Sequence, residues 1–268
     1  MTPTILVTGG TGTLGRIVVP LLREAGRELR VLSRHDHAAG EGVEYVNVDL
    51  LEEDGIEPAL DGIDVVLHLA GGPKGDDKAT ANLMAAAVRA GVRHVVYISV
   101  IGADRVPLGY FAAKLGAERA VIESGLPWTV LRAAQFHDLA LNVVGTMAKL
   151  PVMPAPGGMR LEPVDARDVA ARLAELTLGD PAGRVADLAG PTVYDMADLG
   201  RAYLRARGRR RPTLRVRMPG KAGRAYRAGE NLAAPGADTG TRTWEDFLTE
   251  RVGGPAPASR TATGVEAA

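Results

Sequence analysis

The stretch Ile5-Leu6-Val7-Thr8-Gly9-Gly10-Thr11-Gly12-Thr13-Leu14-Gly15 decides the fold of this chain. Its glycines at positions 9, 12 and 15 follow an apolar run typical of a strand and precede a helical pattern over residues 16–25. The first glycine lets the chain reverse, the second lets backbone N–H groups approach a pyrophosphate, and the third lets the helix pack closely on the strand. The anion would lie at the helix N-terminus, where free N–H groups and the helix dipole favour negative charge. The stretch therefore predicts a dinucleotide-binding turn, with a flexible hairpin or linker as the alternative.

The composition allows one substantial hydrophobic core, with or without an appended lobe. The chain has 268 residues, 46% hydrophobic and 24% charged, with a formal net charge of zero. It shows neither an apolar run long enough to cross a membrane nor a signal-peptide pattern, so we expect a cytoplasmic protein without membrane or nucleic-acid partners. The absence of cysteine excludes disulfides, thiolate metal sites and cysteine nucleophiles, and the five histidines show no ligand spacing, so we expect no metal. Any redox chemistry must come from a bound cofactor.

Strand and helix patterns alternate beyond the glycine turn. Strand-like segments at residues 29–32, 43–48, 63–69 and 94–99 follow in order, and a helix is expected at 76–90. Such alternation specifies a parallel sheet with right-handed crossovers. We therefore expect an α/β fold, a Rossmann-type doubly wound parallel sheet with helices on both faces and a small C-terminal substrate-binding lobe.

The chain divides into three expected parts. Residues 1–133 form the NAD(P)-binding Rossmann domain, and residues 134–252 form a smaller substrate lobe interleaved with elements that return to the main domain. Residues 253–268, rich in Gly, Pro, Ala, Ser and Thr, are expected to be a disordered tail. The Pro- and Gly-rich residues 143–163 predict either a loop flap over an apolar substrate pocket or an ordinary surface loop, and Asp168 is expected to cap the helix that follows.

The end of the second strand indicates which dinucleotide is bound. An acidic residue there would accept a hydrogen bond from the ribose 2′-OH of NAD, whereas an arginine suits the 2′-phosphate of NADP. Ser33 and Arg34 occupy this place without an acid, so Arg34 favours NADP, with Ser33 as a helper; a solvated loop arginine is the alternative. Asp49, at the end of the third strand, either accepts from the adenine amino group or caps the following helix.

Small residues follow the fourth strand, where ligands of open α/β sheets bind. Together with the glycine turn, they complete the set of cofactor-binding residues expected from the sequence. These are Thr8, Gly9, Gly12, Thr13, Leu14, Gly15, Ser33, Arg34, Asp49, Leu50, Leu69, Ala70, Gly71 and Lys114.

Tyr110 and Lys114 form the second chemical signal. They lie four residues apart in a segment of helical composition, so they share one helix face. An ammonium beside the phenol would lower its pKa from the usual value of about 10, and such a tyrosine can donate a proton to a carbonyl oxygen that receives hydride. Lys114 can also hold the nicotinamide ribose. The alternative is a half-buried aromatic residue beside a solvated lysine.

Taken together, these residues resemble the short-chain dehydrogenase/reductase superfamily, and more narrowly its atypical and extended branch, the NmrA-like NAD(P)-binding proteins. The glycine turn is similar to the cofactor fingerprint of that branch. Residues 97–99 followed by 110–118 are similar to its active-site segment, residues 125–136 to its sixth strand and following loop, and residues 163–170 to the segment that returns to the main domain. The resemblance covers roughly residues 3–250.

The resemblance implies a Ser-Tyr-Lys group with a supporting asparagine, so Ser99 joins Tyr110 and Lys114 as a candidate catalytic residue. The chain departs from that pattern in two places. Ser99 lies eleven residues before Tyr110, which puts the usual catalytic hydroxyl near Ile101, and the nearest candidate for the supporting asparagine is Asn82.

Residues 201–227 contain ten arginines and one lysine but no acid. The neutral overall charge and the strand-like alternation at residues 214–218 argue against nucleic-acid binding. We expect a solvated basic face, with an interaction surface or the rim of an anionic-substrate site as alternatives.

Functions of different classes remain open at this stage. The first is an NADPH-dependent oxidoreductase, monomer or homodimer, that transfers hydride to a small apolar carbonyl, quinone or related acceptor. The second is a non-catalytic NADP(H)-binding regulator that senses redox state, favoured by the position of Ser99 and by the basic segment. A nucleotide-sugar epimerase or dehydratase is a weaker third, because it needs tightly held NAD and Arg34 favours NADP.

Overall fold

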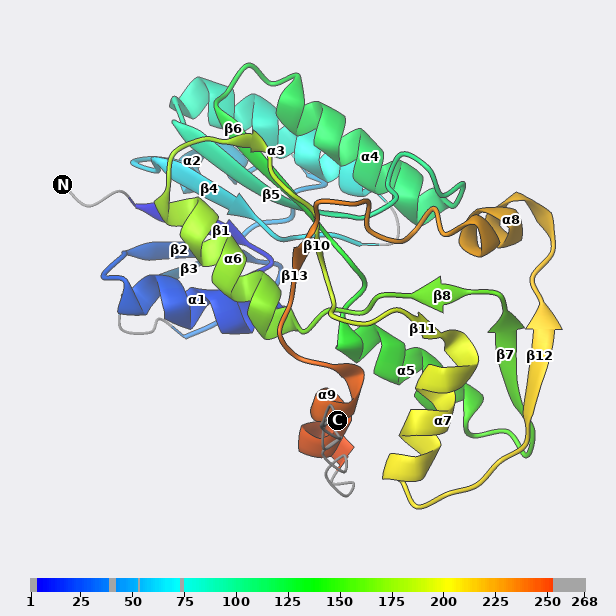
Figure 1. The fold of residues 1–268 in the computed structure, drawn as a ribbon. Coiled ribbons are helices and arrows are strands. Elements are labelled where there is room, and N and C mark those ends of the chain that lie inside the picture. The colour runs from blue at the N-terminus through cyan, green and yellow to red at the C-terminus, as the bar shows by residue number, and fades with distance from the viewer. Residues whose placement is uncertain (1–3, 39–41, 53, 73–74, 253–268) are drawn as a thin grey trace, which may run out of the picture.

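The computed structural model describes residues 4–38, 42–52, 54–72 and 75–252. Its main sheet is built from parallel strands (Figure 1). Among these residues the sheet has nine strands: β1 (Ile5–Thr8), β2 (Leu29–Ser33), β3 (Val43–Asn47), β4 (Val65–His68), β5 (His94–Val100), β6 (Trp128–Ala133), β9 (Gly183–Arg184), β10 (Leu188–Ala189) and β13 (Asp238–Thr239). Their order is β13-β10-β6-β5-β4-β1-β2-β3, with β9 beside β6. The predicted Rossmann-type α/β fold is confirmed.

Helices cover both faces of this sheet (Figure 1). Helices α1 (Gly15–Glu24) and α6 (Ala166–Leu178) contact each other on one face. Helices α2 (Ile56–Ala59), α3 (Asp76–Ala90) and α4 (Gly109–Ile122) lie on the other, where α3 contacts both neighbours. No helix of the described residues is both long and apolar enough to span a membrane.

The central strand β1 explains why the sequence shows an apolar run rather than an alternating pattern. Ile5 and Val7 pack into the core beneath α1 and α6, whereas Leu6 packs into the core beneath α2, α3 and α4. All three side chains are buried. A parallel strand covered by helices on both faces must be apolar at every position, because neither face meets water.

A smaller lobe lies beside the sheet. Its elements are α5 (His137–Met147), β7 (Met153–Gly157), β8 (Arg160–Leu161), β11 (Tyr194–Asp195), α7 (Met196–Ala206), β12 (Thr213–Arg217), α8 (Gly220–Ala228) and α9 (Trp244–Val252). Strand β7 pairs with β12 in parallel, and β8 pairs with β11 in antiparallel. The chain passes between lobe and sheet several times, because α6, β9, β10 and β13 belong to the main body. The segment 253–268, expected to be a disordered tail, is outside the described residues.

Two expectations for this part of the chain are wrong. Residues 143–163 do not form one loop, because they contain the end of α5 and the strands β7 and β8, whose partners lie far along the chain. Helix α6 is capped by Asp165, which accepts from the backbone N–H of Arg167 at 2.8 Å. Asp168 lies in the first turn and instead accepts from the N–H of Thr241 at 2.9 Å, so it anchors the segment that leads to α9.

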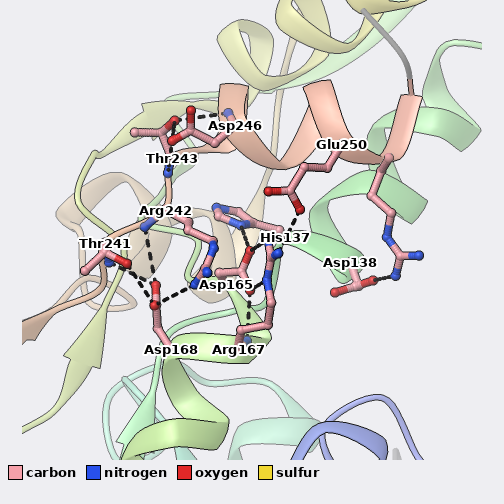
Figure 2. A network of polar contacts seen from close by, with 11 residues as sticks. His137, Asp138, Asp165, Arg167, Asp168, Thr241, Arg242, Thr243, Asp246 and Glu250 are labelled. Atoms are coloured by element: carbon pink, nitrogen blue, oxygen red, sulfur yellow. Dashed lines mark hydrogen bonds and ion pairs between the residues drawn. The ribbon is translucent and has the colours of Figure 1, made fainter. Parts of the chain in front are cut away.

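Helix α9 is held to the lobe by apolar contacts and to α6 by charge. Trp244 and Phe247 stack on each other and pack with α5 and α7. Figure 2 shows the polar side of this junction, where the guanidinium of Arg167 bridges Asp165 and Glu250, each at 2.8 Å. These contacts fix the C-terminal helix across the boundary between lobe and sheet.

Candidate cofactor and active site

A cavity of about 1280 Å³ opens at the carboxyl ends of the sheet strands and continues along the lobe. Pockets for small ligands usually measure roughly 300–1000 Å³, so this one has room for a dinucleotide and a second ligand. Nearly all the site residues expected from the sequence line it: Thr8, Gly9, Gly12, Thr13, Leu14, Ser33, Arg34, Asp49, Leu50, Leu69, Ala70, Gly71, Ser99, Tyr110 and Lys114. Gly15 is the exception.

The glycine turn has the geometry of a phosphate cradle. Gly9 has φ +68°, and a Cβ there would lie 2.7 Å from the backbone nitrogen of Ala70. The N–H of Gly12 donates to the carbonyl of Gly9 at 3.0 Å, which closes the turn in front of α1. A Cβ on Gly15 would lie 2.4 Å from Gly10 Cα, so this glycine permits close packing behind the cradle rather than ligand contact.

A buried hydrogen-bonded chain supports the floor of the cavity. The hydroxyl of Thr8 accepts from the backbone N–H groups of the two residues after β4 and lies 2.6 Å from Nδ1 of His68. His68 Nε2 lies 2.9 Å from the hydroxyl of Thr80, which donates to the carbonyl of Asp76. Thr80 therefore accepts from Nε2–H, and Thr8 donates to Nδ1. Burial, with a smaller contribution from Lys114, lowers the pKa of His68 to about 3, so the ring is neutral.

At the end of the cavity expected to hold the adenosine, Arg34 is exposed and lines the wall. Ser33 is buried next to it, where its hydroxyl accepts from the N–H of His35 at 3.1 Å and lies 3.0 Å from Nε2 of His37. Ser33 thus orders the loop that presents Arg34.

The loop after β3 is held by two polar side chains. Asp49 accepts from the N–H of Leu51 at 3.0 Å and lines the cavity, while α2 begins only at Ile56. Asp49 therefore does not cap that helix, and its contact with adenine stays a prediction. Asn82 donates to the carbonyl of Leu50 at 3.0 Å, so it fixes this loop rather than supporting the candidate catalytic residues.

Lys114 lies in the cavity wall beside a carboxylate that the sequence analysis did not single out. Its Nζ is 2.9 Å from Asp76 Oδ2 and donates to the hydroxyl of Tyr97 at 3.3 Å. The two charged side chains are only 8% and 4% exposed. A Cβ on Gly71 would lie 2.7 Å from Nζ, so any larger residue at position 71 would displace the ammonium. In the sequence, Asp76 looks like an ordinary acidic residue in the first turn of a helix.

Tyr110 also lines the cavity, 37% exposed, but its electrostatic environment differs from the expected one. Burial, followed by the charges of Asp76 and Tyr226, raises the pKa of Tyr110. The expected lowering by Lys114 is therefore wrong, because burial and the charge of Asp76 act in the opposite direction and the ammonium of Lys114 is paired with Asp76. Tyr226 is a second phenol in the cavity wall. The buried hydroxyl of Ser99 faces the cavity and has no hydrogen-bond partner among the described residues.

Helix α4, which carries Tyr110 and Lys114, is fixed to the sheet by a buried ion pair. Arg132 of β6 donates to both carboxylate oxygens of Glu118, each at 2.7 Å, and to Asp104 at 2.8 Å. Such a two-pronged contact restricts rotation as well as distance. It therefore sets the position of the candidate catalytic residues along the cavity.

The lobe closes the cavity with an apolar wall. The arginines of residues 201–227 that lie in the described part of the chain do not line it, so the proposed rim for an anionic substrate is not supported. Among the described residues, one arginine and one lysine line the cavity, and these are Arg34 and Lys114. From the lobe side the wall consists of Phe136, Leu139, Ala140, Val143, Pro156, Met159, Leu161 and Met196, and Phe111 of α4 adds an aromatic ring from the main body.

The site combines three features: a glycine cradle at a helix N-terminus, a large cavity at the carboxyl ends of parallel strands, and a tyrosine and a lysine in the cavity wall. Together they are typical of dinucleotide-dependent oxidoreductases. The NAD(P)H-binding family matches residues 9–178, and the chain belongs to this family. Family membership confirms the expected NAD(P)H cofactor and the expected superfamily.

Two relatives show what family members do. The chain is 35% identical over 195 residues to a (4-alkanoyl-5-oxo-2,5-dihydrofuran-3-yl)methyl phosphate reductase of Streptomyces griseus, covering 70% of this chain and 68% of that protein. It is 32% identical over 214 residues to an NAD(P)H azoreductase of Xenophilus azovorans, covering 76% of this chain and 74% of that protein. These relationships support the expected oxidoreductase class.

A solved structure shows the same fold. The NADPH-dependent quinone oxidoreductase of Escherichia coli, solved with NADPH, superposes with a TM-score of 0.72 and 21% sequence identity over 95% of this chain and 96% of that one. At this identity the likeness concerns the fold alone, and it extends through the lobe as well as the sheet.

Proposed function

We propose that this protein is an NADPH-dependent reductase that transfers hydride to a small, neutral, apolar acceptor such as a quinone, an azo compound or a carbonyl compound. The observation that carries the proposal is one cavity that joins the glycine cradle, the hydroxyls of Tyr110 and Ser99, and an apolar wall. The names of the two relatives support reductase activity, and the azoreductase supports an azo compound as acceptor, whereas the substrate named for the other relative carries a phosphate.

The chain's own residues would divide the work along the cavity. The glycine turn and the N-terminus of α1 hold the pyrophosphate, Arg34 binds the 2′-phosphate, and Lys114 donates to a hydroxyl of the nicotinamide ribose. When bound, NADPH supplies the hydride. Tyr110 donates a proton to the acceptor atom that gains negative charge, and Ser99 donates a hydrogen bond to the same atom.

An acceptor screen tests this function. NADPH absorbance is followed with quinones, azo dyes, ketones and phosphorylated carbonyl compounds, and the neutral apolar acceptors are expected to be reduced fastest, because the substrate end of the cavity has an apolar wall. NADPH binding without oxidation by any acceptor would contradict the proposal and leave the redox-sensing regulator in its place.

Cofactor choice gives a separate prediction. Arg34→Ala is expected to weaken NADPH binding about 10- to 100-fold and to leave NADH binding unchanged, because a charge-assisted hydrogen bond contributes roughly 1.5–3 kcal/mol. Titration calorimetry with both cofactors measures this. Arg119→Ala, which removes an exposed arginine of α4 that does not line the cavity, is the matched control. Equal affinity of the unmodified protein for NADH and NADPH would contradict the assignment of Arg34.

A further inference from the structure

The ion pair between Asp76 and Lys114 is an unusual component of a cavity wall. Both side chains are almost entirely buried, yet both line the cavity. Removing two charges from water is costly, and a buried pair often stabilises a fold no better than apolar residues of the same size. The presence of this pair beside the candidate active site therefore indicates a role in the site.

The surrounding backbone is built to let the pair form. Asp76 is the first residue of α3, where the helix dipole favours a carboxylate. Helices α3 and α4 pack against each other, and a Cβ on Gly116 would lie 2.9 Å from Cβ of Asp77. Gly71 keeps the space around Nζ free. Two glycines thus permit the approach that brings Asp76 to Lys114.

The contacts of the ammonium define its orientation. A lysine ammonium has three N–H donors and no acceptor. One N–H donates to the Tyr97 hydroxyl at 3.3 Å, and the Asp76 carboxylate holds the ammonium as an ion pair at 2.9 Å, so donor capacity remains for a hydroxyl group of a ligand in the cavity. Without the carboxylate, the flexible side chain of Lys114 would lose the partner that fixes the position of the ammonium.

We propose that Asp76 is a positioning residue that holds the Lys114 ammonium in the cavity wall and whose negative charge strengthens the hold of Tyr110 on its proton. This role rests on the reductase function proposed above. Reduction consumes a proton, and Tyr110 can supply one until the pH rises through its pKa, so the charge of Asp76 extends the alkaline range over which the phenol remains a proton donor. The charge of Asp76 is among the causes of the raised pKa of Tyr110.

The binding part of the proposal is tested by a double-mutant cycle on the dissociation constant of NADPH. Asp76→Ala and Lys114→Met are each expected to weaken binding about tenfold, and the double variant is expected to bind no more weakly than Lys114→Met alone. Additive losses, or an unchanged constant for Asp76→Ala, would overturn the proposal. Asp77→Ala, an exposed neighbour in the same helical turn, is the matched control and should bind NADPH as the unmodified protein does.

Asp76→Asn tests the charge separately from the contact. The amide oxygen can accept a hydrogen bond from Lys114, so NADPH affinity should be largely retained. If the alanine variant does not fold, Asp76→Ser, which also lacks the carboxylate and suits the start of a helix, takes its place in the binding cycle. Proton donation is lost as pH rises through the pKa of Tyr110. Removing the negative charge lowers that pKa, so the alkaline fall of kcat should move to lower pH.

Further outcomes and a control complete the test of Asp76. A loss of kcat that is uniform across pH would overturn the electrostatic part of the proposal, and Asp77→Asn should leave the profile in place. The binding cycle needs no acceptor, so it decides the role of Asp76 even if the acceptor screen fails. The titratable or charged groups near Tyr110 and Lys114 are Asp76 on α3, Glu118 on α4, Tyr97 on β5, His68 on β4 and Tyr226 on α8.

Discussion

Tyr110→Phe is expected to lower kcat about 10²- to 10³-fold while leaving the dissociation constant of NADPH nearly unchanged. A positioned general acid contributes roughly 10²–10⁴-fold to a rate, and the phenylalanine ring fills the same space without the proton. Steady-state kinetics with the best acceptor from the screen, together with a direct NADPH titration, separates the two quantities. Unchanged turnover would remove Tyr110 from the mechanism.

The cavity offers a matched control for this prediction. Tyr226 is a second phenol in the same wall, contributed by α8 of the lobe, and its pKa is also raised by burial. Tyr226→Phe makes the same chemical change on the lobe side of the cavity and should retain most of kcat. If Tyr226→Phe lost most of kcat and Tyr110→Phe did not, the proton donor would be Tyr226. Lys114 lies on α4, so it would then be on a different helix from the proton donor.

Local patterns in the sequence were sufficient to predict the strands, turn and helix start around the part of the cavity where we propose that the cofactor binds. The run from Ile5 to Gly15 contains a strand, a turn and a helix start, and each depends mainly on residues close to it in the chain. The same holds for Arg34, which follows directly after the last residue of β2. Parallel strands place such loops at one edge of a sheet, so their assembly into one cavity followed from the alternation of strands and helices.

The surroundings of Tyr110 and Lys114 could not be predicted in the same way. Tyr110 and Lys114 were identified from their spacing, but the electrostatics around them depend on Asp76, which lies on another helix. Its carboxylate reaches Lys114 only because α3 and α4 approach closely at Gly116. A single sequence contains no signal for that distance, and so the direction of the pKa shift of Tyr110 was predicted wrongly.

The lobe was harder still to predict, since its strands are short and their partners are distant. Strand β7 pairs with β12, about sixty residues further along the chain, and β8 and β11 have two residues each. The prolines at 154 and 156 suggested a loop. They are tolerated here because β7 pairs with a single neighbour, and proline is acceptable in an edge strand.

Gly9→Ala is expected to produce the largest loss of cofactor binding, with NADPH affinity reduced at least about 100-fold. Gly9 adopts φ +68°, which costs a residue with a side chain about 1–2 kcal/mol. In addition, the new Cβ would lie within 3 Å of backbone atoms of Leu69 and Ala70, which cannot rotate away as a side chain would. The turn would have to shift, and with it the N–H groups that we propose hold the pyrophosphate. We expect the free energy of unfolding to fall by about 3 kcal/mol in total.

Gly26→Ala separates the two contributions. Gly26 follows α1 with φ +74°, and a Cβ there would meet no atom within 4 Å. This variant should therefore lose only the conformational term of about 1–2 kcal/mol and should bind NADPH normally. Urea unfolding of both variants, with NADPH titration of the folded protein, measures the difference. If Gly9→Ala lost no more stability than Gly26→Ala and kept its NADPH affinity, the close approach of the turn to the end of β4 would not be what shapes the phosphate cradle.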